Sequence, residues 1–274
     1  MSEKPEQTSP DQELQRLLGE AVELRTEIET KKSTGADLLR LDQAFVTASQ
    51  IAEQYFCEKK LEMVYERGEI ETEPKRTGSE GHETLQAESI PSTWEEVFQK
   101  VMSGGAVVAQ ELPLIARHDG LVLAGRPDIV VFKDRQPLLI LECKFTKSRT
   151  PQNSHHVQAG VYAKLLENMG FDSSQLRYVI ALVSPELKTD PTLFTRLLKT
   201  STETASLPSH LEFEGGIICK YDYDSELAVA NIEWALEYWK GNRDAIPTRN
   251  PNKCRSCEYS KECPSSLASR HNDP

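Results

Sequence analysis

Two short polar motifs on either side of an apolar run constrain the fold of this chain most strongly. Gly125-Arg-Pro-Asp128 precedes the run Ile129–Leu141, and Glu142-Cys-Lys144 follows it. The run is interrupted by the polar segment Lys133–Pro137, so β-branched and apolar residues stand on both sides of a turn signal. This pattern predicts a β-hairpin with a polar turn.

The predicted hairpin gathers charged side chains at neighbouring strand positions. Side chains at i and i+2 share a face, so Glu142 and Lys144 point the same way, near Asp128. Cys143 points to the other face, into the core. Two carboxylates and an ammonium are costly to leave half-buried, and a divalent ion with oxygen ligands would explain them. The alternative interpretation is a Glu142–Lys144 ion pair on an ordinary sheet edge.

Composition limits the partners of the chain. Its 274 residues are enough for one large domain or two small ones, and its formal net charge is −11. An acidic balance argues against a general coating of nucleic acid, because phosphate binding favours a basic surface. Basic residues over 144–149 and after Lys240 are compatible with a transient nucleic-acid substrate, with solvated surface charge as the alternative.

The sequence shows neither a membrane-spanning segment nor a signal peptide. No apolar run approaches the roughly 18 residues that span a bilayer, and the polar N-terminal segment lacks the apolar core of a signal peptide. We therefore expect a cytoplasmic protein without membrane contact. Its six cysteines are then expected to be ligands, redox groups or core residues rather than disulfides.

The polar C-terminal segment carries Cys254, Cys257 and Cys263 in a C-x2-C-x5-C spacing. The segment has too few apolar residues to form a core, so metal ligation is the favoured interpretation. Four thiolates would complete a tetrahedral zinc site or an iron–sulfur cluster, and spacing alone does not separate the two. Cys57, which lies among polar residues, is the best candidate for the fourth ligand. Cys143 and Cys219 lie in apolar strands, where cysteine is a small core residue.

The rest of the chain predicts a mixed α/β fold. An amphipathic pattern over 13–32 indicates a helix that either packs on the core or forms a partner-binding arm. Further helices are expected at 38–66, 79–88, 154–168 and 225–240, with a helix and polar loop over 190–208. Strands are expected at 107–115, 120–123 and 176–184, and a strand or pair of strands at 211–223.

Other polar residues carry weaker signals. Gln158 and Tyr162 are four apart on a helix and share a face, so they can lie over the Glu142 strand. Taken singly they fit a surface glutamine and a half-buried tyrosine. His155 and His156 are expected to form a surface pair at the helix start. His82 fits an ordinary histidine unless the fold brings it to the hairpin.

Taken together, these motifs resemble the PD-(D/E)xK nuclease superfamily in its RecB-like branch. Asp128 belongs to a PD pair, Glu142-Cys-Lys144 matches the ExK motif, and Gln158-x-x-x-Tyr162 follows. The segment ending in His82 is similar to the metal-binding histidine motif of that branch. The cysteines are similar to those of its iron–sulfur nucleases, and motif order is most similar to the CRISPR-associated exonuclease of the Cas series, family four.

The resemblance implies a role for each of these residues. His82, Asp128, Glu142 and the backbone carbonyl of Cys143 would hold Mg²⁺ or Mn²⁺. Lys144 would position or activate the attacking water, while Gln158 and Tyr162 would orient Lys144 or the DNA strand. The thiolates of Cys57, Cys254, Cys257 and Cys263 would bind a [4Fe-4S] cluster, with Zn²⁺ as the alternative.

The implied fold is a restriction-endonuclease-like α/β core with a mixed central sheet flanked by helices. We expect an N-terminal extension over 1–35, a RecB-like nuclease domain over 36–246 and a cysteine-rich, cluster-binding tail over 247–274. The implied activity is hydrolysis of phosphodiester bonds in single-stranded DNA or at DNA ends.

Two biological settings fit this activity. One is CRISPR spacer acquisition in antiviral defence, with adaptation proteins as partners, and the other is DNA repair or recombination. The alternative to a nuclease is a non-catalytic DNA-binding or assembly subunit with a structural metal. The N-terminal helix, the polar insert near 190–210 and the glutamate after Cys57 depart from the family pattern and weaken the CRISPR assignment.

Overall fold

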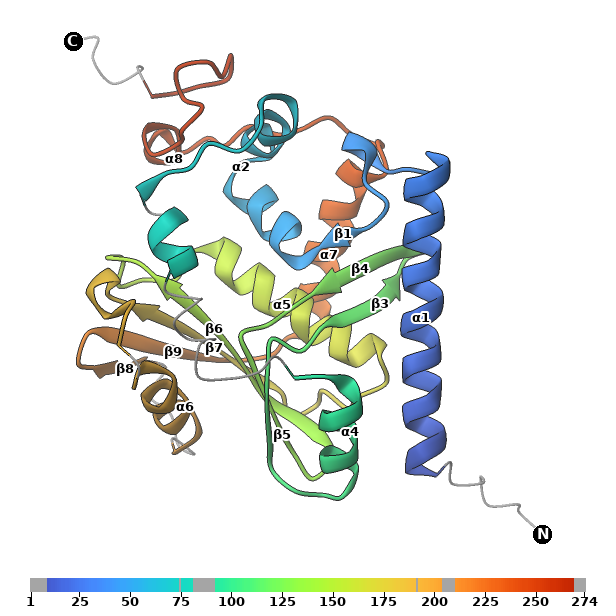
Figure 1. The fold of residues 1–274 in the computed structure, drawn as a ribbon. Helices are drawn as coiled ribbons and strands as arrows, with labels where there is room; N and C mark the ends of the chain where they lie inside the picture. Colours follow the sequence, from blue (N-terminus) through green and yellow to red (C-terminus); the bar gives the residue numbers. More distant parts are fainter. Residues whose placement is uncertain (1–8, 74, 81–91, 191, 204–209, 269–274) are drawn as a thin grey trace.

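The computed structural model of the chain describes residues 9–73, 75–80, 92–190, 192–203 and 210–268. At its centre is a mixed six-stranded sheet with the order β2-β5-β6-β7-β9-β8 (Figure 1). The strands are β2 (Val107–Gln110), β5 (Ile129–Lys133), β6 (Gln136–Phe145), β7 (Arg177–Val183), β8 (His210–Phe213) and β9 (Gly216–Asp222). β6 and β7 are parallel, and the other neighbouring pairs are antiparallel. The mixed α/β fold expected from the sequence is confirmed.

The predicted hairpin forms the middle of this sheet. Lys133 pairs with Gln136, so only Asp134 and Arg135 lie in the turn. Both adopt left-handed backbone angles, with φ of 50° and 70°, as a two-residue type I′ turn requires. Strand β6 pairs with β5 on one side and β7 on the other. The Glu142–Lys144 ion pair of the alternative interpretation forms, at 2.7 Å, but it lies on an interior strand and not at a sheet edge.

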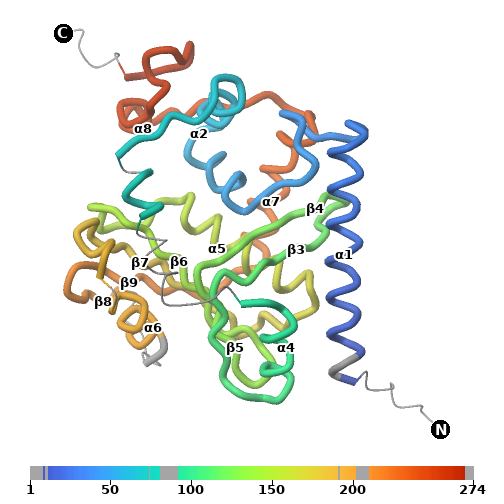
Figure 2. The backbone as a smooth tube through the Cα atoms, in the orientation of Figure 1, coloured from blue at the N-terminus to red at the C-terminus, as the bar shows by residue number. Residues whose placement is uncertain are grey.

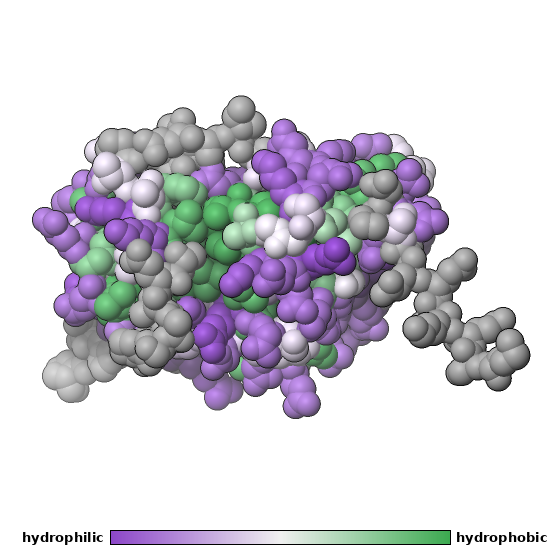
Figure 3. All heavy atoms as spheres, turned by 90° about the horizontal axis from the view of Figure 1, so that it is seen from below, coloured by the Kyte–Doolittle hydropathy of each residue, from purple (hydrophilic) through white to green (hydrophobic). Residues whose placement is uncertain are grey.

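Helices cover both faces of the sheet. The larger core joins sheet residues Val130 and Ile140 to α4 (Trp94–Met102), α5 (Asn153–Asn168) and α7 (Ser225–Trp239). On the opposite face, α6 (Leu193–Glu203) packs against Leu139, Leu141 and Cys143. Alternation along β6 thus sends even-numbered residues toward α5 and odd-numbered residues toward α6. Seen from below, the molecule shows a band of hydrophobic residues bordered by hydrophilic ones (Figure 3).

A second sheet of three strands lies beside the N-terminal helix. Its order is β1 (Val46–Thr47), β4 (Leu121–Gly125) and β3 (Leu114–His118). The helix α1 (Pro10–Thr34) runs along this side of the molecule (Figure 1). Its residues Leu17, Leu24 and Ile28 are buried. Of the two expectations for this helix, packing on the core is confirmed.

The helix α2 (Ala48–Arg67) begins at a capping box formed by Thr47 and Gln50 and is interrupted at Cys57. Cys57 has φ −173° and ψ 116°, an extended conformation inside the helical segment. The short helix α8 (Pro251–Arg255) and the chain after it lie beside the second half of α2 (Figure 2). The Tyr259 hydroxyl donates a hydrogen bond to the Gly68 carbonyl at 2.5 Å, which fastens the two segments together.

Several boundaries differ from the sequence expectations. The helix expected at 38–66 begins only at Ala48, after the 3-10 turn η1 (Arg40–Asp42) and β1. The strand expected at 107–115 is divided into β2 and β3. Helix α4 and the 3-10 turn η2 (Pro185–Leu187) lie where no separate element was expected. Most of the helix expected at 79–88 falls outside the described residues. In the described ranges, no helix has the length and apolar character needed to cross a membrane.

Candidate active site and cysteine site

The motif residues of the hairpin meet at the end opposite its turn. Ile129 pairs with Leu141, so the register continued by one residue places Asp128 opposite Glu142. The Asp128 carboxylate accepts a hydrogen bond from the Cys143 amide at 2.7 Å. The Cys143 side chain is fully buried among apolar residues on the other face, as expected.

A chain of hydrogen bonds connects the β6 strand to α5. The Lys144 ammonium donates to Glu142 Oε1 at 2.7 Å and to Gln158 Oε1 at 3.0 Å. The Gln158 amide nitrogen donates to the Tyr162 hydroxyl at 2.8 Å and to Ser49 Oγ at 3.4 Å. The structure thus brings together five of the predicted site residues: Asp128, Glu142, Lys144, Gln158 and Tyr162.

Burial and charge set the electrostatics of this site. Glu142 is only 3% exposed and depends on the Lys144 ammonium for charge compensation. Burial lowers the pKa of Lys144, but the Glu142 and Asp128 carboxylates raise it by more, so the net pKa lies above its ordinary value. Burial, together with Glu142 and Asp128, raises the pKa of the Tyr162 phenol well above its ordinary value. Tyr162 is therefore a neutral hydrogen-bonding group here.

Close packing at Gly125 fixes the position of Tyr162. A Cβ atom at Gly125 would lie 2.7 Å from Tyr162 Cε1 and 2.8 Å from Cδ1. Carbon atoms that are not bonded to each other pack best at about 3.5–4.0 Å, so only glycine allows this approach. The glycine of the Gly125–Asp128 motif therefore holds open the space that the α5 tyrosine occupies.

The three candidate histidines differ in their placement. His82 lies outside the described residues. His155 and His156 are half-buried rather than the surface pair expected, and His156 Nδ1 hydrogen-bonds with the Tyr178 hydroxyl at 3.0 Å. Burial, the Lys144 ammonium and His156 lower the pKa of His155 to about 4. Its spacing of three residues from Gln158 on one helix is the signal that could have placed it near the site.

The donor set at the hairpin fits a hard divalent cation. Asp128 and Glu142 supply carboxylate oxygens, the ligand type that Mg²⁺ and Mn²⁺ prefer. Within the described residues, no three His, Cys, Asp or Glu side chains are grouped closely enough to hold a metal ion. The expected third side-chain ligand is His82, which lies outside those residues.

The four candidate cluster cysteines line one hollow between α2 and the C-terminal segment. The hollow has a volume of about 20 Å³. In this structure of the described residues, its thiols are not grouped closely enough to hold a metal ion. Cys254 is buried, the other three are partly exposed, and all four are free thiols. They are Cys57, Cys254, Cys257 and Cys263. Cys143 and Cys219 are buried in the sheet, as expected for core residues.

Two polar contacts hold the interrupted helix beside this hollow. Lys253 donates to the carbonyls of Tyr55 and Phe56 at 2.9 and 3.2 Å, which caps the first half of α2. The Thr248 amide donates to the Cys57 sulfur at 3.4 Å. Hydrogen bonds from Lys253 to the residues before Cys57, and from Thr248 to Cys57 itself, therefore stabilise the extended conformation at Cys57.

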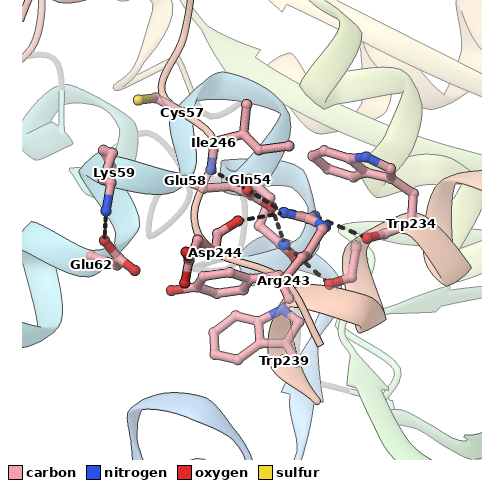
Figure 4. Close-up of polar contacts among 12 residues, drawn as sticks. Gln54, Cys57, Glu58, Lys59, Glu62, Trp234, Trp239, Arg243, Asp244 and Ile246 are labelled. Carbon is pink, nitrogen blue, oxygen red and sulfur yellow. Dashed lines mark hydrogen bonds and ion pairs between the residues drawn. The ribbon is translucent and has the colours of Figure 1, made fainter. Parts of the chain in front are cut away.

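The residue after Cys57 anchors a buried ion pair. Glu58 is fully buried and accepts two hydrogen bonds from the Arg243 guanidinium, each of 2.7 Å. It also accepts from the Gln54 amide nitrogen and the Ile246 backbone amide, both at 2.7 Å (Figure 4). The contacts satisfy both carboxylate oxygens and tie α2 to the chain that follows α7.

Comparison with known proteins identifies the class of this fold and site. A sequence model of the PD-(D/E)XK nuclease superfamily matches residues 7–264. The chain therefore belongs to the PD-(D/E)XK nuclease superfamily, whose members typically use Mg²⁺ or Mn²⁺.

Similarity to individual proteins is more limited. A segment is 37% identical over 43 residues to "Exonuclease V, mitochondrial" of Candida albicans and 35% identical to that of Candida dubliniensis. Each match covers 16% of this chain and only 7% of the length of the curated relative. The crystal structure of SSO0001 is similar with a TM-score of 0.47 and 14% identity, over 89% of this chain and 96% of that one.

Proposed function

We propose that this protein is a divalent-metal-dependent DNA exonuclease acting on single strands or DNA ends. The main support is the convergence of Asp128, Glu142 and Lys144 at one end of the central hairpin, with Lys144 bonded to both Glu142 and Gln158. Superfamily membership supports nuclease chemistry. The segment similar to proteins named exonuclease V supports action at strand ends.

Each residue has a role in the proposed reaction. Asp128, Glu142 and the Cys143 carbonyl, with His82, would hold the ion. A bound Mg²⁺ or Mn²⁺ lowers the pKa of water and neutralises charge on the phosphate oxygens. Lys144 positions or activates the attacking water.

The α5 residues act through Lys144. Gln158 holds the ammonium at a fixed distance from Glu142, because its amide oxygen accepts the second hydrogen bond of Lys144. Tyr162 and Ser49 receive the hydrogen bonds of the Gln158 nitrogen and so fix which way the amide faces. These three residues are positioning residues, and the resemblance also allows Gln158 and Tyr162 to orient the DNA strand.

The test compares Lys144→Ala with the wild type on end-labelled single-stranded DNA. We expect degradation with Mg²⁺ or Mn²⁺, none in EDTA, and a loss of at least about 100-fold in Lys144→Ala. Lys133→Ala is the control, because Lys133 is an exposed lysine at the turn end of the same hairpin. Equal degradation in EDTA would rule out the metal mechanism. DNA binding by a wild type that cleaves with neither ion would favour the non-catalytic subunit instead.

We also propose that Cys57, Cys254, Cys257 and Cys263 bind a [4Fe-4S] cluster with a structural role. The main support is that all four thiols line one hollow. Anaerobically purified protein should be brown with broad visible absorbance, and Cys263→Ala should lose this absorbance. Ser260→Ala, which changes another residue of the same hollow, should keep it. Colourless protein with stoichiometric zinc would establish the alternative.

The biological setting stays a prediction. CRISPR spacer acquisition and DNA repair require the same chemistry and differ in partners. Specific binding to a CRISPR adaptation protein would support the first setting.

A further inference from the structure

We propose that a hollow beside the candidate active site binds the backbone of one DNA strand and leads it to the carboxylates. The hollow lies between α1, the first turn of α2 and the loop after β4. It has a volume of about 440 Å³ and is open to solvent. This role depends on the proposed nuclease function, because that function requires a strand to reach Glu142.

The hollow shares a wall with the candidate active site. Tyr162 and Ser49 line it, and both accept hydrogen bonds from Gln158, which in turn accepts from Lys144. Arg126 also lines it, two residues before Asp128 in the chain. The hollow is therefore linked to Lys144 through the Gln158 side chain.

Two arginines line the hollow. Arg25 comes from α1 and Arg126 from the loop after β4, and both are exposed. Across the described ranges, neither guanidinium forms a hydrogen bond or ion pair. By contrast, Arg16 and Arg117 both pair with glutamates of α1. Free guanidiniums in a shared hollow are suited to bidentate binding of phosphate.

Two further features add positive potential. Thr47, Ala48 and Ser49 line the hollow at the start of α2, where a helix carries partial positive charge. Lys32 lies two turns after Arg25 on α1, with its ammonium 5.3 Å from the centre of the Phe45 ring, which also lines the hollow. Positive charge from α1 and the loop after β4, and partial positive charge from the start of α2, thus surround one opening.

The remaining lining favours a single strand over other anions. Ile28, Leu114 and Ile115 present apolar surface between the cationic groups. A single DNA strand offers phosphates to the arginines and unpaired bases to the apolar wall, whereas a duplex hides its bases. A small anion would leave the apolar wall without a contact.

The test measures binding of fluorescein-labelled oligodeoxythymidine by anisotropy across a range of salt, with Ca²⁺ replacing Mg²⁺. Each phosphate contact on a single strand contributes about 0.7 to the slope of log K against log salt. Arg25→Ala and Arg126→Ala should each weaken binding and lower this slope by about 0.7, and the double variant by about 1.4. Lys133→Ala removes an exposed lysine at the far end of the hairpin and should change neither quantity.

The outcomes separate this proposal from the nuclease assignment. A double variant that binds with the affinity and slope of Lys133→Ala would overturn the strand path, whatever the cleavage activity. A blunt duplex that binds as tightly as the single strand would also overturn it. A third outcome is that the wild type does not cleave with Mg²⁺ or Mn²⁺ while the arginine variants still bind more weakly. This outcome would reject the nuclease function but support the DNA-binding site. Thermal unfolding equal to wild type should verify that both exposed substitutions keep the fold.

Discussion

At Gly125 the missing side chain has a role that extends to the candidate active site. The Tyr162 ring packs where a Cβ atom would stand, and its hydroxyl accepts from the amide nitrogen of Gln158. The opposite end of that amide accepts from Lys144. One backbone position thus supports the orientation of the lysine through two intermediate side chains.

Gly125→Ala is expected to displace the Tyr162 ring. Overpacking of this kind lowers the free energy of unfolding by about 1–3 kcal/mol. Nuclease activity should fall as well, because Gln158 loses its fixed partner. Chemical denaturation and end-labelled DNA digestion measure the two effects.

Gly19→Ala provides the matched control. Gly19 lies in α1 with no atom within 4 Å of its added Cβ, so alanine should raise stability by about 0.5–1 kcal/mol. If Gly125→Ala is as stable and active as the wild type, the contact with Tyr162 does not hold the site.

Among the elements, α2 is the one whose shape depends most on distant residues. Its helical path stops at Cys57 and resumes at Glu58, and the side chains that accommodate this break are Lys253 and Arg243. Lys253 caps the carbonyls before the break, while Arg243 neutralises the carboxylate after it. The break is therefore stabilised by the C-terminal third of the chain.

Arg243→Met is expected to lower the free energy of unfolding by about 3–5 kcal/mol, because it leaves the Glu58 carboxylate buried without its cation. Arg177→Met is the control. Its ion pair with Asp222 is exposed, so its loss should cost about 0–1 kcal/mol. Equal losses for the two variants, measured by urea unfolding, would contradict a structural role for the buried pair.

The elements that the sequence predicted well are those with local signals. The hairpin has β-branched runs, a turn and motif residues within a short stretch, and both its form and the meeting of Asp128 with Glu142 follow from that stretch. The start of α2 was missed because Thr47 and Gln50 make a capping box inside a longer helical pattern. Helix α4 was missed although Thr93 caps it and Trp94, Val97, Phe98 and Val101 face the core.

Residues that depend on tertiary placement were missed for a physical reason. Ser49 reaches Gln158 only because α2 packs against α5, a contact that no spacing in the sequence encodes. Arg25 and Arg126 are a hundred residues apart and meet only through the packing of α1. Arg126 alone had a sequence signal, since it lies inside the Gly125–Asp128 motif.

Over the whole molecule, the cysteine hollow joins the first third of the chain to the last. If, as proposed, Cys57 and the three C-terminal cysteines hold a metal or cluster, it would close a loop that contains the whole six-stranded sheet. Closing such a long loop reduces the entropy of the unfolded chain. The stability of the nuclease core and that of the C-terminal segment are then coupled.

Cys263→Ala is expected to lower the midpoint of thermal unfolding of the whole protein, not only to loosen the tail. The reason is that loss of the bound group reopens the long loop and removes the binding free energy of the folded state. Ser260→Ala should leave the midpoint near that of the wild type. An unchanged midpoint in Cys263→Ala, for protein purified with its metal, would show that the hollow does not bind a stabilising group.

The interior position of β6 has a consequence for how the protein moves. Its backbone is bonded to strands on both sides, and the Cys143 amide donates to the Asp128 carboxylate. Amide protons in such a strand exchange with solvent deuterium only when a large cooperative unit opens. Glu142 and Lys144 therefore lie on backbone that we expect to exchange slowly, and substrate must come to a rigid floor.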